Sequence, residues 1–168
     1  GMLARPKDAR SRDIFNALTE AFDKQKDQQS KNFTAISLAY LGSADPDFDS
    51  DANKRPVTKF MLDHLKKSNT SYEMWTGLAL GVMTFQLAEI GVLASDLVQE
   101  DVLKKFNDSK TQDQLSAFAL ALGLMKHEPA IPDIVAKMND NKTTEFRGYG
   151  AIALGLLGIS ARPQSGFL

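Results

Sequence analysis

The chain has 168 residues, of which 43% are hydrophobic, and its 20 lysines and arginines nearly balance its 21 aspartates and glutamates. This composition excludes wholesale disorder, and a net charge of -1 provides no global field that would draw in nucleic acid or an anionic membrane. The absence of cysteine excludes disulfides, thiolate metal sites and cysteine nucleophiles. We expect a single domain, 1–168, in a compartment that the composition leaves open, with the cytoplasm slightly favoured.

The N-terminal residues 1–12 are expected to be flexible, and they lack the apolar stretch of a secretory signal. A helix is predicted from residue 13, because residues 13–18 repeat the apolar spacing of residues 133–138. It resembles the second helix of a pair whose first helix is missing, and 151–159 resembles a first helix without a second. Either both are specialised caps or the chain was cut from a longer array, and the second explanation is favoured.

Four similar segments predict helices that repeat along the chain. They start 42, 42 and 32 residues apart, at 35–42 (AISLAYLG), 77–84 (GLALGVMT), 119–126 (ALALGLMK) and 151–158 (AIALGLLG). KFNDSKT at 105–111 and KMNDNKT at 137–143 keep the same offset of 32. We call the helices of these segments the first helices; their apolar residues recur at helical spacing.

Glycines within and around these helices need an explanation, because each costs about 1 kcal/mol relative to alanine in a helix interior. They are Gly77, Gly81, Gly123, Gly150 and Gly155. We expect close approach of neighbouring helices to offset this cost.

Second helices are predicted after the first ones. Their aligned apolar triplets are Met61, Leu62 and Leu65, then Val102, Leu103 and Phe106, then Ile134, Val135 and Met138. Helix starts are indicated by Thr70 with Glu73 and Thr111 with Gln114, which have capping-box spacing, and by Pro56 and Pro132, which suit a first turn. No strand-like alternation competes with this prediction.

The segment ALALGLMKHEPAIPDIVAKMNDNKT resembles a HEAT-like repeat, of the kind also found in phycobilisome-lyase proteins, and the resemblance covers roughly residues 30–160. It implies an all-α fold, a right-handed α-α superhelix (solenoid) of helical hairpins, with first helices on the convex side and second helices on the concave side. The expected helix pairs are approximately 13–70, 71–111, 112–143 and 144–168. The first two repeats are longer, through insertions at 43–55 and 84–96, and inserted loops in solenoids often bind.

The insertion at 43–55 carries aspartates at alternate positions, Asp45, Asp47, Asp49 and Asp51. A calcium loop counted from Asp47 would need glycine at Ala52 and glutamate at Thr58, so the pattern fails. We expect a solvated acidic loop, with weak cation binding as the alternative.

The predicted binding residues are cations at the ends of successive second helices and one apolar side chain. They are Lys66, Lys104, Lys105 and Lys137, with Phe48 in the acidic loop. The simplest explanation of the lysines is favourable interaction with the helix dipole. The functional hypothesis is a row of cations on the concave face that meets an acidic partner, so that charge reversal at Lys104 and Lys105 weakens binding without unfolding the chain.

Aromatic residues at or near the first helices could anchor a partner, because tryptophan and tyrosine are enriched in binding hot spots. They are Tyr40, Tyr72, Trp75 and Tyr149. For Trp75 we expect packing in the core.

The sequence gives little support for a metal site or a dinucleotide-binding site. The two histidines, His64 and His127, fall in different repeats. His127 with Glu128 is similar to one His-Glu pair of HEAT-like di-iron hydroxylases, which need several such pairs. Gly148, Gly150 and Ala153 have dinucleotide-fingerprint spacing, but no strand is predicted before them.

The sequence therefore predicts a non-enzymatic protein-protein interaction scaffold, with no catalytic residues, metal or cofactor. We expect a protein partner, neither nucleic acid nor membrane, and a monomer. Two alternatives remain: a tetrapyrrole lyase or chaperone-like subunit that binds a flat ligand in the groove, and a structural segment of a longer solenoid.

Overall fold

The computed structural model describes residues 7–67, 72–93, 95–140 and 145–160, and within these ranges it contains helices and no strand. The α-helices are α1 (Lys7–Lys24), α2 (Gln28–Ala44), α3 (Pro56–Lys67), α4 (Tyr72–Glu89), α5 (Asp96–Asp108), α6 (Gln112–Leu124), α7 (Ile131–Asn139) and α8 (Phe146–Ser160). Short 3-10 turns lie at Asp51–Asn53 and Glu128–Ala130. The all-α prediction is confirmed, although α1 begins at Lys7, inside the segment expected to be flexible. None of the helices described here has the length and apolar character to cross a membrane.

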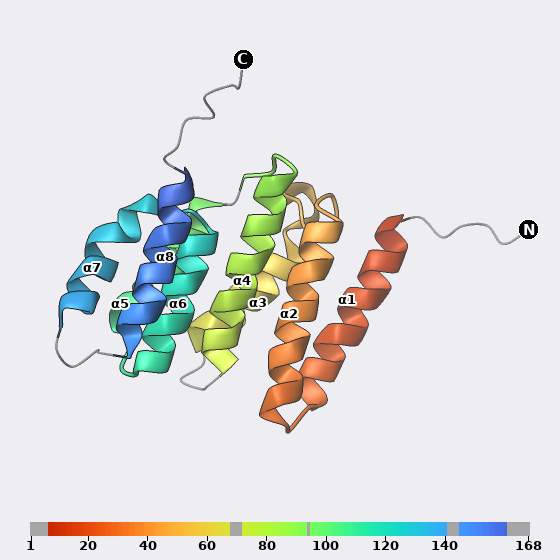
Figure 1. Ribbon diagram of the computed structural model, residues 1–168. Coiled ribbons are helices and arrows are strands. Elements are labelled where there is room, and N and C mark those ends of the chain that lie inside the picture. Colours follow the sequence, from red (N-terminus) through yellow and green to blue (C-terminus); the bar gives the residue numbers. More distant parts are fainter. Residues whose placement is uncertain (1–6, 68–71, 94, 141–144, 161–168) are drawn as a thin grey trace, which may run out of the picture.

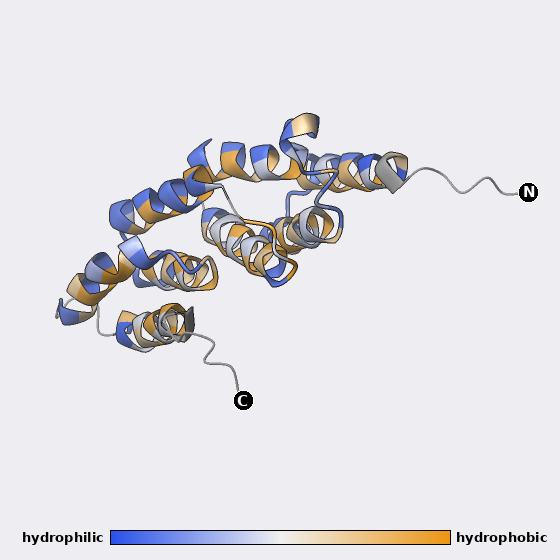
Figure 2. Cartoon of the chain, turned by 90° about the horizontal axis from the view of Figure 1, so that it is seen from above, coloured by the Kyte–Doolittle hydropathy of each residue, from blue (hydrophilic) through white to orange (hydrophobic). Residues whose placement is uncertain are grey.

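The helices form two layers (Figure 1). The predicted first helices α2, α4, α6 and α8 stand side by side in one row, which we call the inner layer. Helices α1, α3, α5 and α7 form the other row, the outer layer (Figure 2). The buried core lies between the rows, where the fully buried Phe106, Phe118 and Leu80 are found.

Each outer helix packs chiefly against the inner helix that follows it in the chain: α1 against α2, α3 against α4, α5 against α6, and α7 against α8. The predicted pairs 71–111 and 112–143 each began with an inner helix, whereas the packed hairpins begin with an outer one, so they are in the opposite phase. Repeat spacing cannot reveal this phase, because a periodic pattern is the same wherever the repeat is said to begin. With this phase, α1 and α8 each have a hairpin partner.

Glycines let the inner helices approach closely. A Cβ atom added to Gly81 of α4 would lie 2.8 Å from the Cα atom of Ala121 in α6, and one added to Gly123 of α6 would lie 3.0 Å from the carbonyl oxygen of Ala153 in α8. The expected role of these two glycines is confirmed. Gly155 differs, since a Cβ atom added there meets nothing within 4 Å among the described residues.

The rows bend toward the inner layer, which Figure 2 shows on the inside of the curve. The inner helices contact one another extensively, whereas α3, α5 and α7 make far fewer contacts with each other. Tight spacing in one row and wide spacing in the other curve the array toward the tight row. The expectation that α3, α5 and α7, the predicted second helices, would line the concave face is therefore wrong: α2, α4, α6 and α8 line it.

Several predicted helix starts are confirmed. Thr111 accepts a hydrogen bond from the backbone N–H of Gln114, and the Gln114 side chain accepts one from Thr111 in return, which completes the capping box of α6. Pro56 begins α3 and Pro132 lies in the first turn of α7. Thr70 falls outside the described residues.

Candidate functional site

The solvent-facing side of the inner layer carries apolar side chains at equivalent positions of its four helices. Three such rows run across the layer: Phe33, Trp75, Ala117 and Tyr149; Ile36, Leu78, Leu120 and Ile152; Tyr40, Val82, Leu124 and Leu156. Five of these are large and exposed: Phe33, Tyr40, Trp75, Tyr149 and Ile152. Contiguous apolar surface of this kind is typical of interaction sites, whereas scattered apolar residues are not.

A groove lies on this surface where α6 carries a small residue. Ala117 stands where the other three inner helices carry an aromatic ring, and a hollow of about 350 Å³ occupies the position. Trp75 of α4 and Tyr149 of α8 border it, on opposite sides because α4 and α8 flank α6. Leu78 and Leu120 add apolar surface to the lining. We call this hollow the aromatic groove.

The aromatic groove has one charged lining residue among those that the structure describes. This residue is Asp113, an exposed side chain in the first turn of α6. The nearby Ser116 hydroxyl donates a hydrogen bond to the Gln112 carbonyl oxygen at 2.7 Å. The lining is therefore apolar and aromatic, with a single carboxylate at its edge.

Trp75 is fixed in place by the neighbouring helix. Its indole Nε1 lies 3.0 Å from the side-chain amide of Asn32 in α2, which accepts the indole hydrogen when the amide oxygen faces it. Asn32 is itself 9% exposed, and its side-chain amide lies within hydrogen-bond distance of Gln28 on the same helix. Trp75 remains 38% exposed, so the expectation that it packs in the core is wrong. A held but exposed ring is suited to binding, because little side-chain entropy is lost when a partner contacts it.

The predicted lysines lie on the outer layer, and three of the four are engaged within the chain. Lys66 of α3 pairs with Asp101 of α5 at 2.6 Å. Lys105 of α5 pairs with Glu73 of α4, whose side chain is 5% exposed. Lys104 is exposed, and Lys137 is half-buried and already has an interaction within the chain.

Charge reversal at Lys105 would place two carboxylates together at a largely buried position. Removing one partner of such a pair leaves a buried charge without compensation, which destabilises a fold. The expectation that the Lys105 reversal spares the fold is therefore inconsistent with the structure. Only Lys104 remains a clean probe of the predicted cation row.

Phe48 is not a surface contact, since it is 0% exposed. Its ring packs edge-on against Phe15 of α1, with ring centroids 5.9 Å apart, and the Arg12 guanidinium lies 5.5 Å from its centroid. The acidic insertion folds around this ring and anchors α1. Sequence reasoning missed this because an aromatic residue among aspartates looks solvated.

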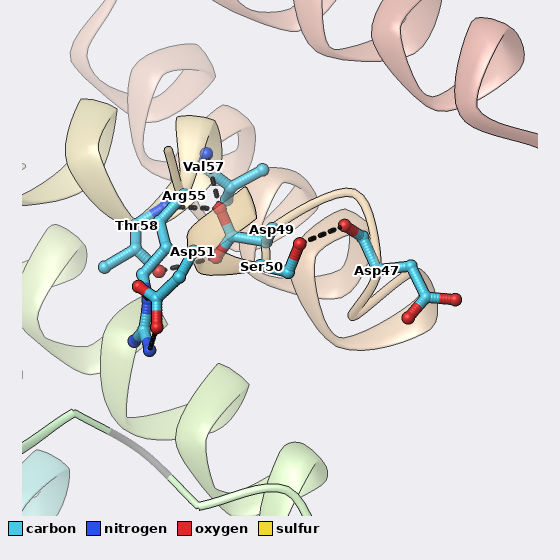
Figure 3. A network of polar contacts seen from close by, with 7 residues as sticks. All are labelled: Asp47, Asp49, Ser50, Asp51, Arg55, Val57 and Thr58. Carbon is cyan, nitrogen blue, oxygen red and sulfur yellow. Dashed lines mark hydrogen bonds and ion pairs between the residues drawn. The ribbon is translucent and has the colours of Figure 1, made fainter. Parts of the chain in front are cut away.

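The expectation of a solvated acidic loop is wrong for two of its four aspartates, since Asp45 and Asp49 are buried. Asp45 accepts a hydrogen bond from the Ser11 hydroxyl at 2.5 Å. Asp49 accepts backbone N–H bonds from Val57 (2.8 Å) and Thr58 (3.1 Å) and the Thr58 hydroxyl bond, which caps α3 (Figure 3). The part of the chain described here contains no cluster of three or more His, Asp or Glu side chains that could hold a metal.

Burial raises the pKa of the Asp49 carboxyl, while its hydrogen bonds with Thr58 and Val57 oppose the shift. Asp51 and Arg55 form a two-point ion pair beside it, with contacts of 2.7 and 3.1 Å (Figure 3). Asp51 and Arg55 pair with each other, and Asp49 forms its hydrogen bonds within the chain. A small hollow where they meet the second insertion at Val92 and Leu93 is therefore a weaker candidate for binding than the aromatic groove.

His127 lies in the turn that follows α6, and its side chain contacts α5. Its Nδ1 atom is 3.2 Å from the Gln99 side-chain oxygen, and its buried Nε2 atom has no hydrogen-bond partner within the described residues. Burial lowers the pKa of His127, and the carboxylates of Glu100 and Asp96 oppose this shift. Neutral imidazole in this position fits a packing role.

Comparisons with protein-family models, with curated proteins and with solved structures gave no significant match to this chain. The groove must therefore be interpreted from its own residues. A signal for it was present in the sequence: Phe33, Trp75 and Tyr149 stand two residues before three of the four repeated segments. Ala117 breaks that series and marks the hollow.

Proposed function

We propose that this chain is a non-enzymatic protein-interaction scaffold, a short right-handed superhelix of HEAT-like hairpins that holds a partner protein on its inner layer. The observation that carries the proposal is that exposed aromatic side chains recur on the inner helices, the row that lies on the inside of the curve in Figure 2. Tryptophan and tyrosine dominate binding hot spots because each buries a large area at low entropic cost.

The packed hairpins support the HEAT-like part of the proposal. With α3 taken as the partner of α4 and α5 as the partner of α6, the helix that comes first in each hairpin lies on the outside of the bend. The helix that comes second lies on the inside. This is the arrangement that the HEAT-like resemblance implies.

The test fills the aromatic groove without changing charge. In the Ala117→Trp variant an indole occupies the hollow between α4 and α8, so we expect the captured partner to fall by about tenfold or more, the loss of one hot-spot contact. The measurement is quantitative capture of proteins from lysate of the source cells, with the wild-type chain, the variant and a bead-only sample in parallel.

Lys104→Glu on the outer layer is the matched control. It should retain the partner if binding uses the inner layer, and lose it if the cation row is the contact surface. Capture that is insensitive to Ala117→Trp would refute the groove. A purified chain that carries a visible chromophore would favour the tetrapyrrole alternative.

A further inference from the structure

The aromatic groove combines two aromatic side chains with one carboxylate, so its lining is not purely apolar. Trp75 and Tyr149 border it, and Asp113 stands at its edge. Aromatic ring faces attract cations, tryptophan most strongly, through the negative potential of the ring. A carboxylate beside them attracts the same class of ligand.

The remaining lining suits the stem of a long side chain. Leu78, Ala117 and Leu120 provide apolar surface at the same hollow. Arginine buries its methylene stem along apolar surface while its planar guanidinium stacks on aromatic rings and pairs with carboxylates. An acidic segment would be repelled by Asp113, and a purely apolar one would leave that carboxylate without a partner.

Within the described residues, the chain places no cationic side chain of its own in the aromatic groove. The groove is lined by no described lysine or arginine. Arg147, on the same helix as Tyr149, donates from its Nε atom to the Met138 carbonyl oxygen of α7 at 3.1 Å, so it is held toward the outer layer.

We propose that the aromatic groove receives an arginine side chain from a basic segment of the partner protein. This inference rests on the proposed function and specifies the chemistry of its partner. Trp75 and Tyr149 contact the guanidinium, Asp113 pairs with it, and Asn32 acts as a positioning residue that holds the indole.

The experiment uses blocked pentapeptides of alanine with a central arginine, citrulline or norleucine, titrated into the ¹⁵N-labelled full chain. Trp75 is the one tryptophan of the sequence, so its indole N–H resonance reports the groove directly. We expect the arginine peptide to shift this resonance saturably. Citrulline has the same shape without charge and should bind on the order of fivefold more weakly, the size of an exposed cation–π contact with an exposed ion pair.

Asp113→Asn should remove most of the ion-pair contribution and so reduce the preference for arginine over citrulline. Glu89→Gln, a charge removal of the same size at the far end of α4, should leave it unchanged. If norleucine binds as tightly as arginine, the cationic inference is refuted while the groove remains an apolar docking site. If no peptide shifts the indole resonance, the arginine inference is also refuted. Whether the chain is a protein-interaction scaffold is tested separately, by partner capture with the Ala117→Trp variant.

Discussion

Asp49 acts as a helix cap from a distance. It lies seven residues before Pro56, yet its carboxylate accepts the N–H groups of Val57 and Thr58 at the start of α3. These donors would otherwise be left without partners in the first turn of the helix. A cap of this kind is invisible in sequence, because local capping rules place the acceptor next to the helix.

We predict that Asp49→Ala lowers the free energy of unfolding by about 1–2 kcal/mol, the usual cost of a lost cap. The measurement is urea denaturation followed by circular dichroism. Asp47→Ala, an exposed position two residues earlier, should cost far less. Equal losses in the two variants would contradict the capping role.

Asp49→Asn keeps an acceptor oxygen and removes the charge, so it isolates the effect of pH. The folded-state pKa of Asp49 is raised above 3.8 by burial. A raised carboxyl pKa contributes stability that is complete below the ordinary value and is lost as pH rises through the folded value. The stability of the wild-type chain relative to Asp49→Asn should therefore fall as pH rises from 3.8.

At the scale of elements, the close packing of the inner helices depends on glycines, which carry no side chain where two helices meet. Gly81 and Gly155 occupy the same position of the repeated segment, but only Gly81 faces the backbone of another described helix. One glycine serves close packing and the other does not. The repeat alone predicts the same role for both.

We predict opposite effects of alanine at these two positions. Gly81→Ala forces α4 and α6 apart, because backbone atoms cannot rotate away, and should cost about 1–3 kcal/mol as an overpacked contact does. Gly155→Ala meets open space and should stabilise α8 by about 0.5–1 kcal/mol through its higher helix propensity. Thermal denaturation of both variants tests this, and a shift of the same sign in both would count against it.

At the scale of the molecule, sequence periodicity predicted much of the helical order and not the curvature. Aligned segments such as 77–84 and 119–126 located the inner helices, because burial imposes the same apolar spacing on each repeat. The side on which the array bends depends on which row packs more tightly, and this requires knowing that Gly81 meets Ala121. The aromatic groove was missed for a related reason: an apolar residue at helical spacing, such as Trp75, is usually part of the core.

The order of contacts in the two layers also determines how the molecule opens. Each inner helix contacts its immediate neighbours in the row, so α4 and α6 are braced on two sides, while α8 has only α6 beside it among the described inner helices. In stacked repeat proteins the free energy of folding is approximately a sum of local and nearest-neighbour terms, so a helix with fewer neighbours opens more readily. We predict that amide hydrogens of α8 exchange with solvent faster than those of α4 and α6, as hydrogen–deuterium exchange can measure. Uniform exchange would instead mean that the two layers open as one cooperative unit.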